Sequence, residues 1–290
     1  LAVRALDEII DYQNYPVLAA EKSTKARRSL GIGYIGLAHY LAKNKLKYHD
    51  KEAAMMVNIL TEKFQFALLK ASNNLAKEKG KCDYFDRTKY ADGILPIDTY
   101  KKDIDEIVGS KYTCNWEKLR KDIMKTGLRH STLSAQMPSE SSSVVGNATN
   151  GIEPPRGYLS IKKSKKGPLK QIVPEYSRLK NFYTLLWDMP GNEGYINIVG
   201  AMQKYFDQAI SGNWSYNPTQ YEDNEVPASV MIKDLLTTYK MGWKTSYYQN
   251  TYDSKTEDEE VQPQGLPVQQ PDNVIFLGEQ EEEHCDACEI

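Results

Sequence analysis

The stretch Thr245-Ser246-Tyr247-Tyr248-Gln249-Asn250 follows a helical pattern that runs from about 228 to 241. Apolar side chains recur in that pattern at spacings of three and four, and Gly242 marks its end. Residues 245–248 then favour a strand, because aromatic and β-branched side chains suit a pleated surface. Helices alternate with short strands in this way along the chain, so the sequence predicts an α/β fold.

The remaining elements are predicted from the same kinds of pattern. Apolar periodicity predicts further helices at about 2–12, 35–43, 51–79, 116–126, 176–188 and 194–210. Extended segments are predicted at 29–34 and 131–135, with a hairpin at 158–161 and 169–173 around the basic turn 162–167. Residues 22–28 are predicted to be a basic connector. The apolar face of the 228–241 helix is expected to comprise Ile232, Leu235, Leu236, Tyr239 and Trp243.

Length and composition limit the class of protein. The 290 residues are 40% hydrophobic and 26% charged, which suffices for a sizeable core. A net charge of −2 gives no reason to expect nucleic acid as a partner. No apolar run approaches the roughly 20 residues that span a bilayer, and no signal peptide is recognised. We therefore expect a cytoplasmic protein that binds neither nucleic acid nor a membrane.

The composition changes after residue 250. Acidic runs at 257–260 and 281–283, together with Pro263, Pro267 and Pro271, predict a flexible acidic tail over 251–290 that follows a packed domain over 1–250. The tail carries a C-x-x-C pair, Cys285 and Cys288. This pair fits a redox dithiol, half of a metal site or an inert pair. Thiol–disulfide exchange is favoured, because zinc sites normally need four ligands.

The segment Gly31-Ile32-Gly33-Tyr34-Ile35-Gly36 matches the pattern G-x-G-x-x-G. In a dinucleotide site this turn lets a pyrophosphate approach a helix N-terminus. The preceding strand is very short here, however, and Asp50, the acidic residue at the expected distance, fits a helix cap instead. A tight turn from strand to helix is the favoured interpretation.

The segment Met137-Pro138-Ser139-Glu140-Ser141-Ser142-Ser143 follows a predicted strand and precedes a possible helix start. Hydroxyl groups and free backbone N–H groups at such a start form an anion site without any lysine. The alternative is a serine-rich cap or loop, which composition alone favours.

The adjacent phenols of Tyr247 and Tyr248 also have two interpretations. Aromatic residues in a strand are usually packing residues, and neighbours in a regular strand point to opposite faces. A role that needs both rings together therefore requires an irregular backbone at this position. In that case the ring centroids should lie within roughly 4.5–7 Å, as in other aromatic pairs.

Several motifs occur together in one order. They are Leu30-Gly31-Ile32-Gly33, Gly127-Leu128-Arg129-His130-Ser131, the 137–143 segment, Asn147-Ala148-Thr149-Asn150-Gly151-Ile152-Glu153-Pro154-Pro155-Arg156, Tyr247-Tyr248-Gln249-Asn250 and a C-terminal cysteine pair. From Leu1 to Asn250 the chain resembles the large, catalytic subunit of class Ia ribonucleoside-diphosphate reductase. The glycine-rich turn belongs to that family's pattern, which removes the dinucleotide interpretation.

The resemblance implies the C-terminal portion of a ten-stranded α/β barrel with a flexible tail. The family's radical-bearing cysteine, its two reducing cysteines and its effector-binding domain for ATP and dNTPs lie upstream of the matched region, and Cys82 and Cys114 do not match them. The resemblance therefore implies that the other part of the subunit is a separate polypeptide or was removed. A split bacteriophage gene, acting in the host cytoplasm, would fit this pattern.

The resemblance also implies roles for particular residues. Pro138, Ser139, Glu140, Ser141 and Ser142 match the segment that holds the substrate diphosphate, although a sugar or structural contact suits Glu140 better than a phosphate contact. Tyr247 and Tyr248 match the pair that relays a radical towards the active site. Cys285 and Cys288 match the tail dithiol that reduces the active-site disulfide and is recharged by thioredoxin or glutaredoxin.

The implied partners are an N-terminal polypeptide, a ribonucleoside diphosphate and the small subunit, whose dinuclear iron site and tyrosyl radical supply the oxidant. The chain itself is expected to bind no cofactor or metal. The 228–241 helix resembles the part that lines the groove for the small subunit's C-terminal tail, with plain core packing as the alternative. Alone, the chain is expected to be inactive, and a non-catalytic interaction fragment is the alternative function.

Overall fold

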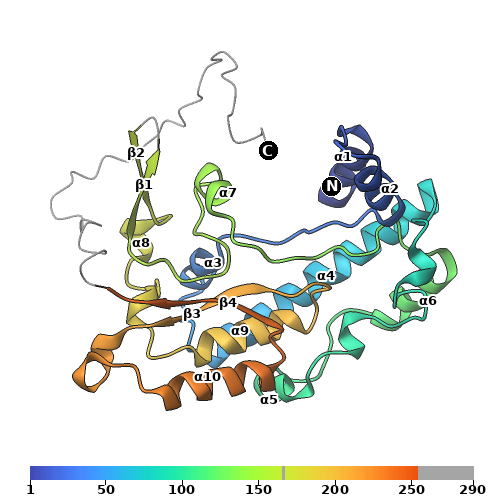
Figure 1. The fold of residues 1–290 in the computed structure, drawn as a ribbon. Helices are drawn as coiled ribbons and strands as arrows, with labels where there is room; N and C mark the ends of the chain where they lie inside the picture. The colour runs from blue at the N-terminus through green and yellow to red at the C-terminus, as the bar shows by residue number, and fades with distance from the viewer. Residues whose placement is uncertain (165–166, 254–290) are drawn as a thin grey trace.

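The computed structural model describes residues 1–164 and 167–253 (Figure 1). The helices are α1 (Ala2–Tyr12), α2 (Leu18–Arg27), α3 (Leu37–Lys43), α4 (Lys51–Lys79), α5 (Asp105–Val108), α6 (Trp116–Thr126), α7 (Glu140–Val145), α8 (Tyr176–Leu179), α9 (Glu193–Gln203) and α10 (Ala228–Met241). The strands are β1 (Leu159–Ser164), β2 (Gly167–Ile172), β3 (Ser211–Tyr216) and β4 (Thr245–Thr251). Short 3-10 turns lie at Phe85–Arg87, Pro96–Asp98, Lys102–Ile104, Leu186–Asp188, Pro218–Gln220 and Glu222–Asn224.

Four extended segments lie side by side, parallel and in chain order, at the centre of the molecule (Figure 1). Ile32 bridges to Ser134, Gln136 bridges to Ile210, and β3 pairs with β4. Helices lie between successive segments in the chain, as parallel connections require. The predicted α/β fold class is therefore confirmed. Within the described residues the row is open and does not close into a barrel.

Helix α4 is the longest element, with 29 residues, and it crosses the molecule diagonally in Figure 1. Its first half packs into one apolar cluster through Ala53 and Val57, and its second half into another through Leu69 and Leu75. The predicted boundaries of this helix are confirmed. Its apolar stripe therefore joins the two hydrophobic cores of the described chain.

The buried face of α4 also carries polar side chains that hold neighbouring loops. The carboxylate of Glu62 accepts hydrogen bonds from the backbone N–H groups of Thr113 (2.7 Å) and Cys114 (2.8 Å) and from the indole of Trp116 (3.1 Å). The Asn73 amide donates to the carbonyl of Gly127 at 2.8 Å. These bonds satisfy groups that would otherwise be buried without partners, so α4 also fixes the two ends of α6.

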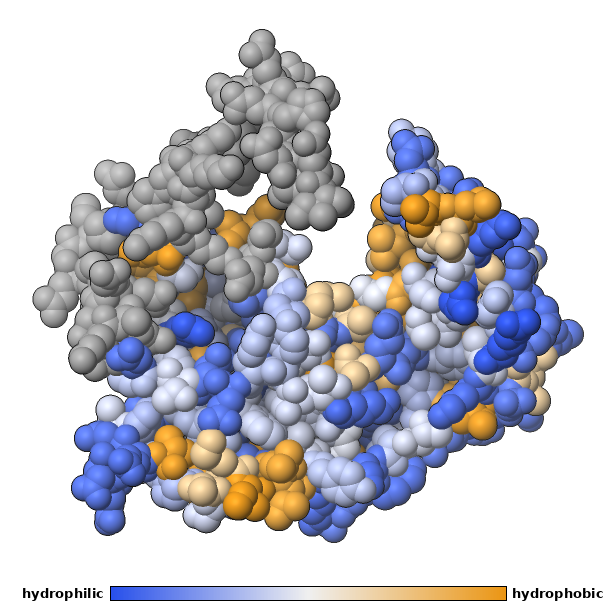
Figure 2. All heavy atoms as spheres, viewed as in Figure 1, coloured by the Kyte–Doolittle hydropathy of each residue, from blue (hydrophilic) through white to orange (hydrophobic). Residues whose placement is uncertain are grey.

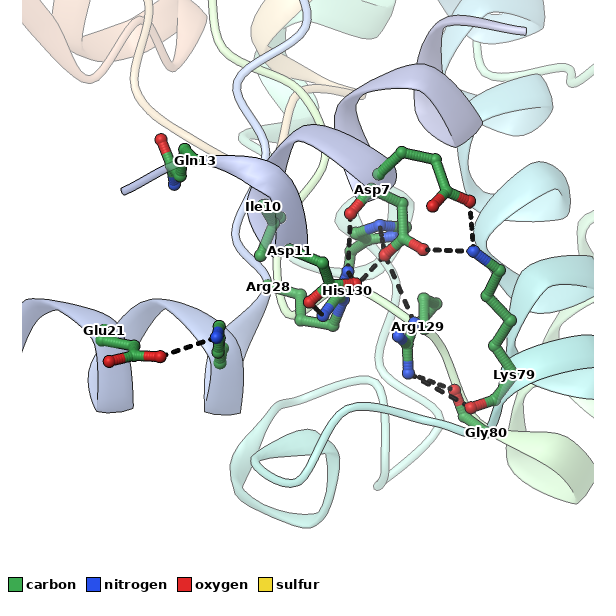
Figure 3. A network of polar contacts seen from close by, with 12 residues as sticks. Asp7, Ile10, Asp11, Gln13, Glu21, Arg28, Lys79, Gly80, Arg129 and His130 are labelled. Atoms are coloured by element: carbon green, nitrogen blue, oxygen red, sulfur yellow. Dashed lines mark hydrogen bonds and ion pairs between the residues drawn. The ribbon is translucent and has the colours of Figure 1, made fainter. Parts of the chain in front are cut away.

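A buried ionic network ties the N-terminal helix to the rest of the domain (Figure 3). The fully buried carboxylate of Asp7 accepts from Arg28 Nε at 2.7 Å, from Arg129 Nε at 3.3 Å and from His130 Nε2 at 3.2 Å. Burial alone would raise the pKa of Asp7, but the hydrogen bond and charge of Arg28 outweigh it and the pKa is lowered. Burial lowers the pKa of His130 to about 4, so this imidazole is neutral at pH 7.

The network also fixes the tautomer of His130. Nε2–H donates to Asp7, which leaves Nδ1 to accept from the hydroxyl of Ser72 on α4 at 2.9 Å. The Ser72 oxygen in turn accepts from the backbone N–H of His130 at 3.2 Å. The segment that enters the second extended strand is thereby anchored to both α1 and α4.

The predicted basic connector at 22–28 is wrong, because α2 occupies Leu18–Arg27. This helix buries none of its side chains, so it lacks the apolar stripe on which the prediction depended. A left-handed residue, Arg28, ends the helix and directs its own side chain into the Asp7 network.

Two predicted helices are too long. The helix predicted at 176–188 is reduced to α8 and a separate 3-10 turn. Lys47 Nζ donates hydrogen bonds to the carbonyls of Asn181 (3.0 Å) and Tyr183 (2.6 Å), which therefore do not accept bonds within a helix. The helix predicted at 194–210 ends at Gln203. Gln203 Nε2 donates to the Gln208 carbonyl, and Gln203 Oε1 accepts from the Ile210 N–H. These two bonds direct the chain after α9 into the row of parallel segments.

The expected apolar face of α10 is largely on the surface. Ile232, Leu235, Leu236 and Tyr239 are 52–68% exposed, and Figure 2 shows hydrophobic side chains gathered along the lower edge, over this helix. Contact with α9 and β3 is made instead by the buried residues Asp234, Thr238 and Met241, of which Asp234 accepts from Asn192 at 2.8 Å. Core packing is therefore the wrong interpretation for these four side chains, while Trp243 is buried as expected.

Candidate functional site

A cavity of about 710 Å³ lies where the 138–174 region meets β3 and β4. Its walls include Pro138, Asn150, Glu153, Asn213 and both Tyr247 and Tyr248. These residues follow, or lie within, the parallel segments, and ligands in α/β folds commonly bind beyond the carboxyl ends of such strands. The cavity thus brings together motifs that are more than 100 residues apart in the sequence.

A bulge in β4 places both tyrosines on one side of the strand. Ser246 lies opposite Gly212 and Gln249 lies opposite Trp214, so Tyr247 and Tyr248 together face the single residue Asn213. The N–H of Tyr248 donates to Asn213 Oδ1 at 3.0 Å instead of to a backbone carbonyl. The irregular backbone that a joint role requires is therefore present.

The two phenol rings are in contact. Their centroids are 4.2 Å apart, slightly closer than the predicted range, and their planes are inclined by 58°. The Tyr248 hydroxyl points at that of Tyr247 with 3.5 Å between the oxygens, which is long for a hydrogen bond. This contact raises the pKa of the Tyr248 phenol. Both rings are more than half exposed, at 54% and 58%, so a partner can reach them.

Asn213 connects the bulge to the opposite wall of the cavity. Its Nδ2 donates to Glu153 Oε1 at 2.7 Å while its Oδ1 holds the N–H of Tyr248. Burial raises the pKa of the Glu153 carboxyl. Glu153 lies in the 147–156 segment, for which the sequence predicts no role of this residue, and no role is predicted for Asn213. A single asparagine in a strand carries no sequence signal of its own.

The predicted serine segment lies at the rim of the same cavity. Pro138 lines it, and Ser139 occupies the position before α7. The Ser139 N–H donates to Asn150 Oδ1 at 3.1 Å, whereas its hydroxyl oxygen is buried without a hydrogen-bond partner in the described chain. Glu140, Ser141 and Ser142 form the first turn of α7, and Ser142 is exposed. Ser139 and Ser142 adjoin the cavity without lining it.

The glycine-rich turn supports the site and leaves no room for a dinucleotide. A Cβ on Gly33 would collide with the carbonyl of Ala135, so a glycine is needed for the first two parallel segments to approach. Gly36, at a φ of 79°, precedes α3. The N–H groups of Gly36 and Leu37 donate to the carbonyls of Thr149 and Gly151, which occupy the helix start where a pyrophosphate would bind. The turn thereby fixes the 147–151 loop.

Other predicted residues fall outside this site. Cys285 and Cys288, with residues 254–290 of the predicted tail, lie outside the described residues, so their role and the boundary at 250 stay predictions. Burial raises the pKa of the Cys82 thiol, which agrees with a structural role. Among the described residues no cluster of His, Cys, Asp and Glu is arranged to hold a metal ion. No helix in residues 1–164 and 167–253 has the length and apolar character to cross a bilayer.

Comparison with known families places this geometry in context. The family model for the ribonucleotide reductase barrel domain matches residues 1–249. The chain therefore belongs to the ribonucleotide reductase barrel-domain family, and the open row of parallel segments with its helices is a portion of that barrel.

Named relatives agree with the family model. The chain is similar to the ribonucleoside-diphosphate reductase alpha subunit of Haemophilus influenzae, with 59% identity over 259 residues, which is 89% of this chain and 34% of the relative. Subunit alpha of reductase 1 from Escherichia coli K12 is 54% identical over 91% of this chain and 34% of its own length. The alpha subunit of Enterobacteria phage T4 is 46% identical over 90% of this chain and 34% of its own length. The chain thus spans about a third of the length of these relatives, and the predicted relation to part of the large subunit is confirmed.

Proposed function

We propose that this chain forms part of the catalytic large subunit of a ribonucleoside-diphosphate reductase. Such an enzyme converts ribonucleoside diphosphates to deoxyribonucleoside diphosphates by a radical mechanism, for DNA precursor synthesis. The observation that carries the proposal is the contact between two phenols on the wall of a substrate-sized cavity. Because the chain spans about a third of the length of its relatives, activity requires the rest of a large subunit and also a small subunit.

In this proposal Tyr247 and Tyr248 relay an oxidising equivalent into the cavity. Each phenol gives up one electron and one proton and recovers them from its neighbour, so one long transfer becomes two short ones. Hydroxyl oxygens 3.5 Å apart suit such an exchange, and the exposed rings suit delivery from a partner. The dinuclear iron site and tyrosyl radical of the small subunit supply the oxidant, and a cysteine in the rest of the large subunit receives it.

The start of α7 is proposed to hold the substrate diphosphate through Pro138, Ser139, Glu140, Ser141 and Ser142. Backbone N–H groups and hydroxyls at the end of a parallel segment suit phosphate oxygens. The buried, unpartnered hydroxyl of Ser139 in the described chain supports this assignment. ATP and dNTP effectors are assigned to the remaining part of the large subunit, and no cofactor is assigned to this chain.

Cys285 and Cys288 are proposed to shuttle electrons from thioredoxin or glutaredoxin to the active-site disulfide. Replacing both by Ser should lower thioredoxin-driven turnover of the assembled enzyme by at least about tenfold, because a tail dithiol is the sole route for a protein reductant. Turnover driven by a small dithiol, which diffuses to the disulfide directly, should persist. Equal losses with both reductants would count against the shuttle.

The exposed face of α10 is proposed to bind the small subunit. Its apolar side chains flank a shallow groove of about 350 Å³ lined by Ile232 and Leu236. Leu236→Glu should weaken small-subunit binding by about tenfold or more, because a desolvated carboxylate opposes apolar contact. Met124→Glu on α6, an apolar residue of similar exposure at 56%, is the matched control and should bind normally. Equal binding by both variants, measured by titration calorimetry, would remove this surface from the interface.

Reconstitution tests the proposed function directly. The chain is mixed with the remaining two thirds of a large subunit and with a small subunit, and reduction of CDP is measured. Turnover that requires all three components is expected. Complex formation without any turnover would instead favour a non-catalytic interaction fragment, for which the exposed α10 face is the supporting observation.

A further inference from the structure

A second cavity, of about 760 Å³, opens at the other end of the parallel row. Its walls include Ser29, Ser131, Asp207 and Lys244, which precede the four extended segments in turn. The tyrosine cavity, by contrast, is lined by residues within or beyond those segments. The second cavity is therefore separate from the tyrosine cavity, and it shares only Tyr239 with the exposed α10 face.

The walls of this second cavity are strongly basic. The cations that line it are Arg27, Arg87, Lys89, Lys101 and Lys244. None of these five forms an ion pair within residues 1–164 and 167–253, whereas other exposed lysines, such as Lys25 and Lys81, are paired with carboxylates at 2.7 Å. A cluster of unpaired like charges is repulsive, and a bound anion would relieve that repulsion.

Two of the cations are held in place by one aromatic ring. The guanidinium carbons of Arg27 and Arg87 lie 4.2 and 4.5 Å from the centroid of Tyr84. Similarly, Lys101 Nζ lies 4.3 Å from the centroid of Tyr239. Contact with the ring restrains each guanidinium group while leaving N–H groups for bidentate bonds to oxyanions. Positioned in this way, the arginines lose little conformational freedom on binding a ligand.

The one acidic side chain that lines this cavity in the described chain offsets only one of the five positive charges. Asp207 accepts hydrogen bonds from the Tyr90 hydroxyl, from Gln65 Nε2 at 3.1 Å, and from the N–H groups of Leu133 (2.6 Å) and Ser134 (3.1 Å). Both carboxylate oxygens are thus engaged by neutral donors of the fold. The positive charge of the cavity remains available to a ligand.

We propose that this cavity binds an oligophosphate anion, either free or as the phosphate chain of a nucleotide. Its volume is that of a small-molecule site, and guanidinium and ammonium groups are the usual ligands of phosphate oxygens. Tyr84, Tyr90 and Tyr100 also line the cavity, but Tyr84 already contacts two arginines and Tyr90 is buried, so recognition is assigned to the phosphates. The site is independent of the proposed reductase activity.

Titration calorimetry of the full chain with tripolyphosphate tests the proposal. We expect saturable binding of one anion that weakens with added salt. The variant Arg87→Gln/Lys244→Gln should bind at least about tenfold more weakly, because two charge-assisted contacts are lost. Lys118→Gln/Lys121→Gln on α6 removes the same charge outside the cavity and should bind within about twofold of the unaltered chain, because distant exposed charges are screened.

ATP in place of tripolyphosphate distinguishes the two sources of phosphate. Tighter binding of ATP assigns a nucleotide, and equal binding assigns the phosphate chain alone. Absence of saturable binding, equal losses in both double variants, or binding of an acidic peptide but not of tripolyphosphate would each overturn the proposal. Circular dichroism establishes that both double variants remain folded.

Discussion

Replacing Tyr247 or Tyr248 by Phe is expected to abolish turnover in the assembled reductase, with a fall in kcat of about a thousandfold or more, equivalent to roughly 4 kcal/mol. Phenylalanine keeps the ring, so the contact between the rings and the bulge in β4 should survive. It has no O–H group, however, and so has no hydrogen atom to exchange. The measurement is the rate of CDP reduction by the reconstituted enzyme.

Tyr252→Phe provides a matched control in the same region. Tyr252 follows β4, and its ring packs against Trp187 with 5.5 Å between centroids. This substitution removes a phenol at the same end of the chain but outside the pair and keeps the packed ring, so it should leave kcat within about twofold of the unaltered enzyme. Binding of the small subunit should be unchanged in all three variants. Substantial turnover by either Tyr247→Phe or Tyr248→Phe would remove the relay assignment.

Asp7→Asn is expected to destabilise the chain by about 3–5 kcal/mol, because a buried cation then loses its buried counter-charge and keeps only the half-exposed carboxylate of Asp11. The cation concerned is Arg28, whose side chain is 5% exposed. Asp11→Asn tests the same arginine from the other side: the Asp11 side chain also bonds to Arg28 but is 47% exposed. Its loss should cost about 1 kcal/mol or less. Urea denaturation at pH 7 separates the two values, and equal effects would contradict the importance of the buried pair.

The same network predicts an acid-sensitive stability. The pKa of His130 is lowered from 6.5 to about 4 by burial, so between these values the unfolded chain binds a proton that the folded chain does not. The free energy of unfolding should therefore be level above pH 6.5 and fall by roughly 3 kcal/mol as the pH drops towards 4. His130→Gln should flatten this slope. The lowered pKa of Asp7 acts in a lower window, because its stabilisation is lost only below the ordinary carboxyl pKa.

The sequence predicts best those helices that carry both a periodic apolar face and a recognisable end. The boundaries of α4, α6 and α10 match the structure, and Asn115 caps α6 by accepting from Lys118 N–H at 3.0 Å. Helix α2 was missed because it buries no side chain. For α10 the apolar face was predicted correctly, but periodicity alone does not say whether such a face meets the core or solvent.

The site was predictable only in part. The tyrosine pair and the serine segment stand out in the sequence, and the need for irregular backbone follows from strand geometry. The bulge itself depends on pairing with β3, and the contribution of Asn213 depends on the same pairing. The basic cavity was not predictable, because its cations come from four separate stretches of the chain that only the tertiary fold brings together.

The bulge in β4 has a consequence for how this chain tolerates change in length. Two residues of β4 face one residue of β3, so the contact between the rings depends on the number of residues as well as on their identity. Deleting one residue there would restore regular alternation and turn the phenols to opposite faces while keeping the flanking chain intact. Single-residue insertions or deletions between Thr245 and Thr251 should therefore be rarer among functional variants than conservative substitutions at the same positions.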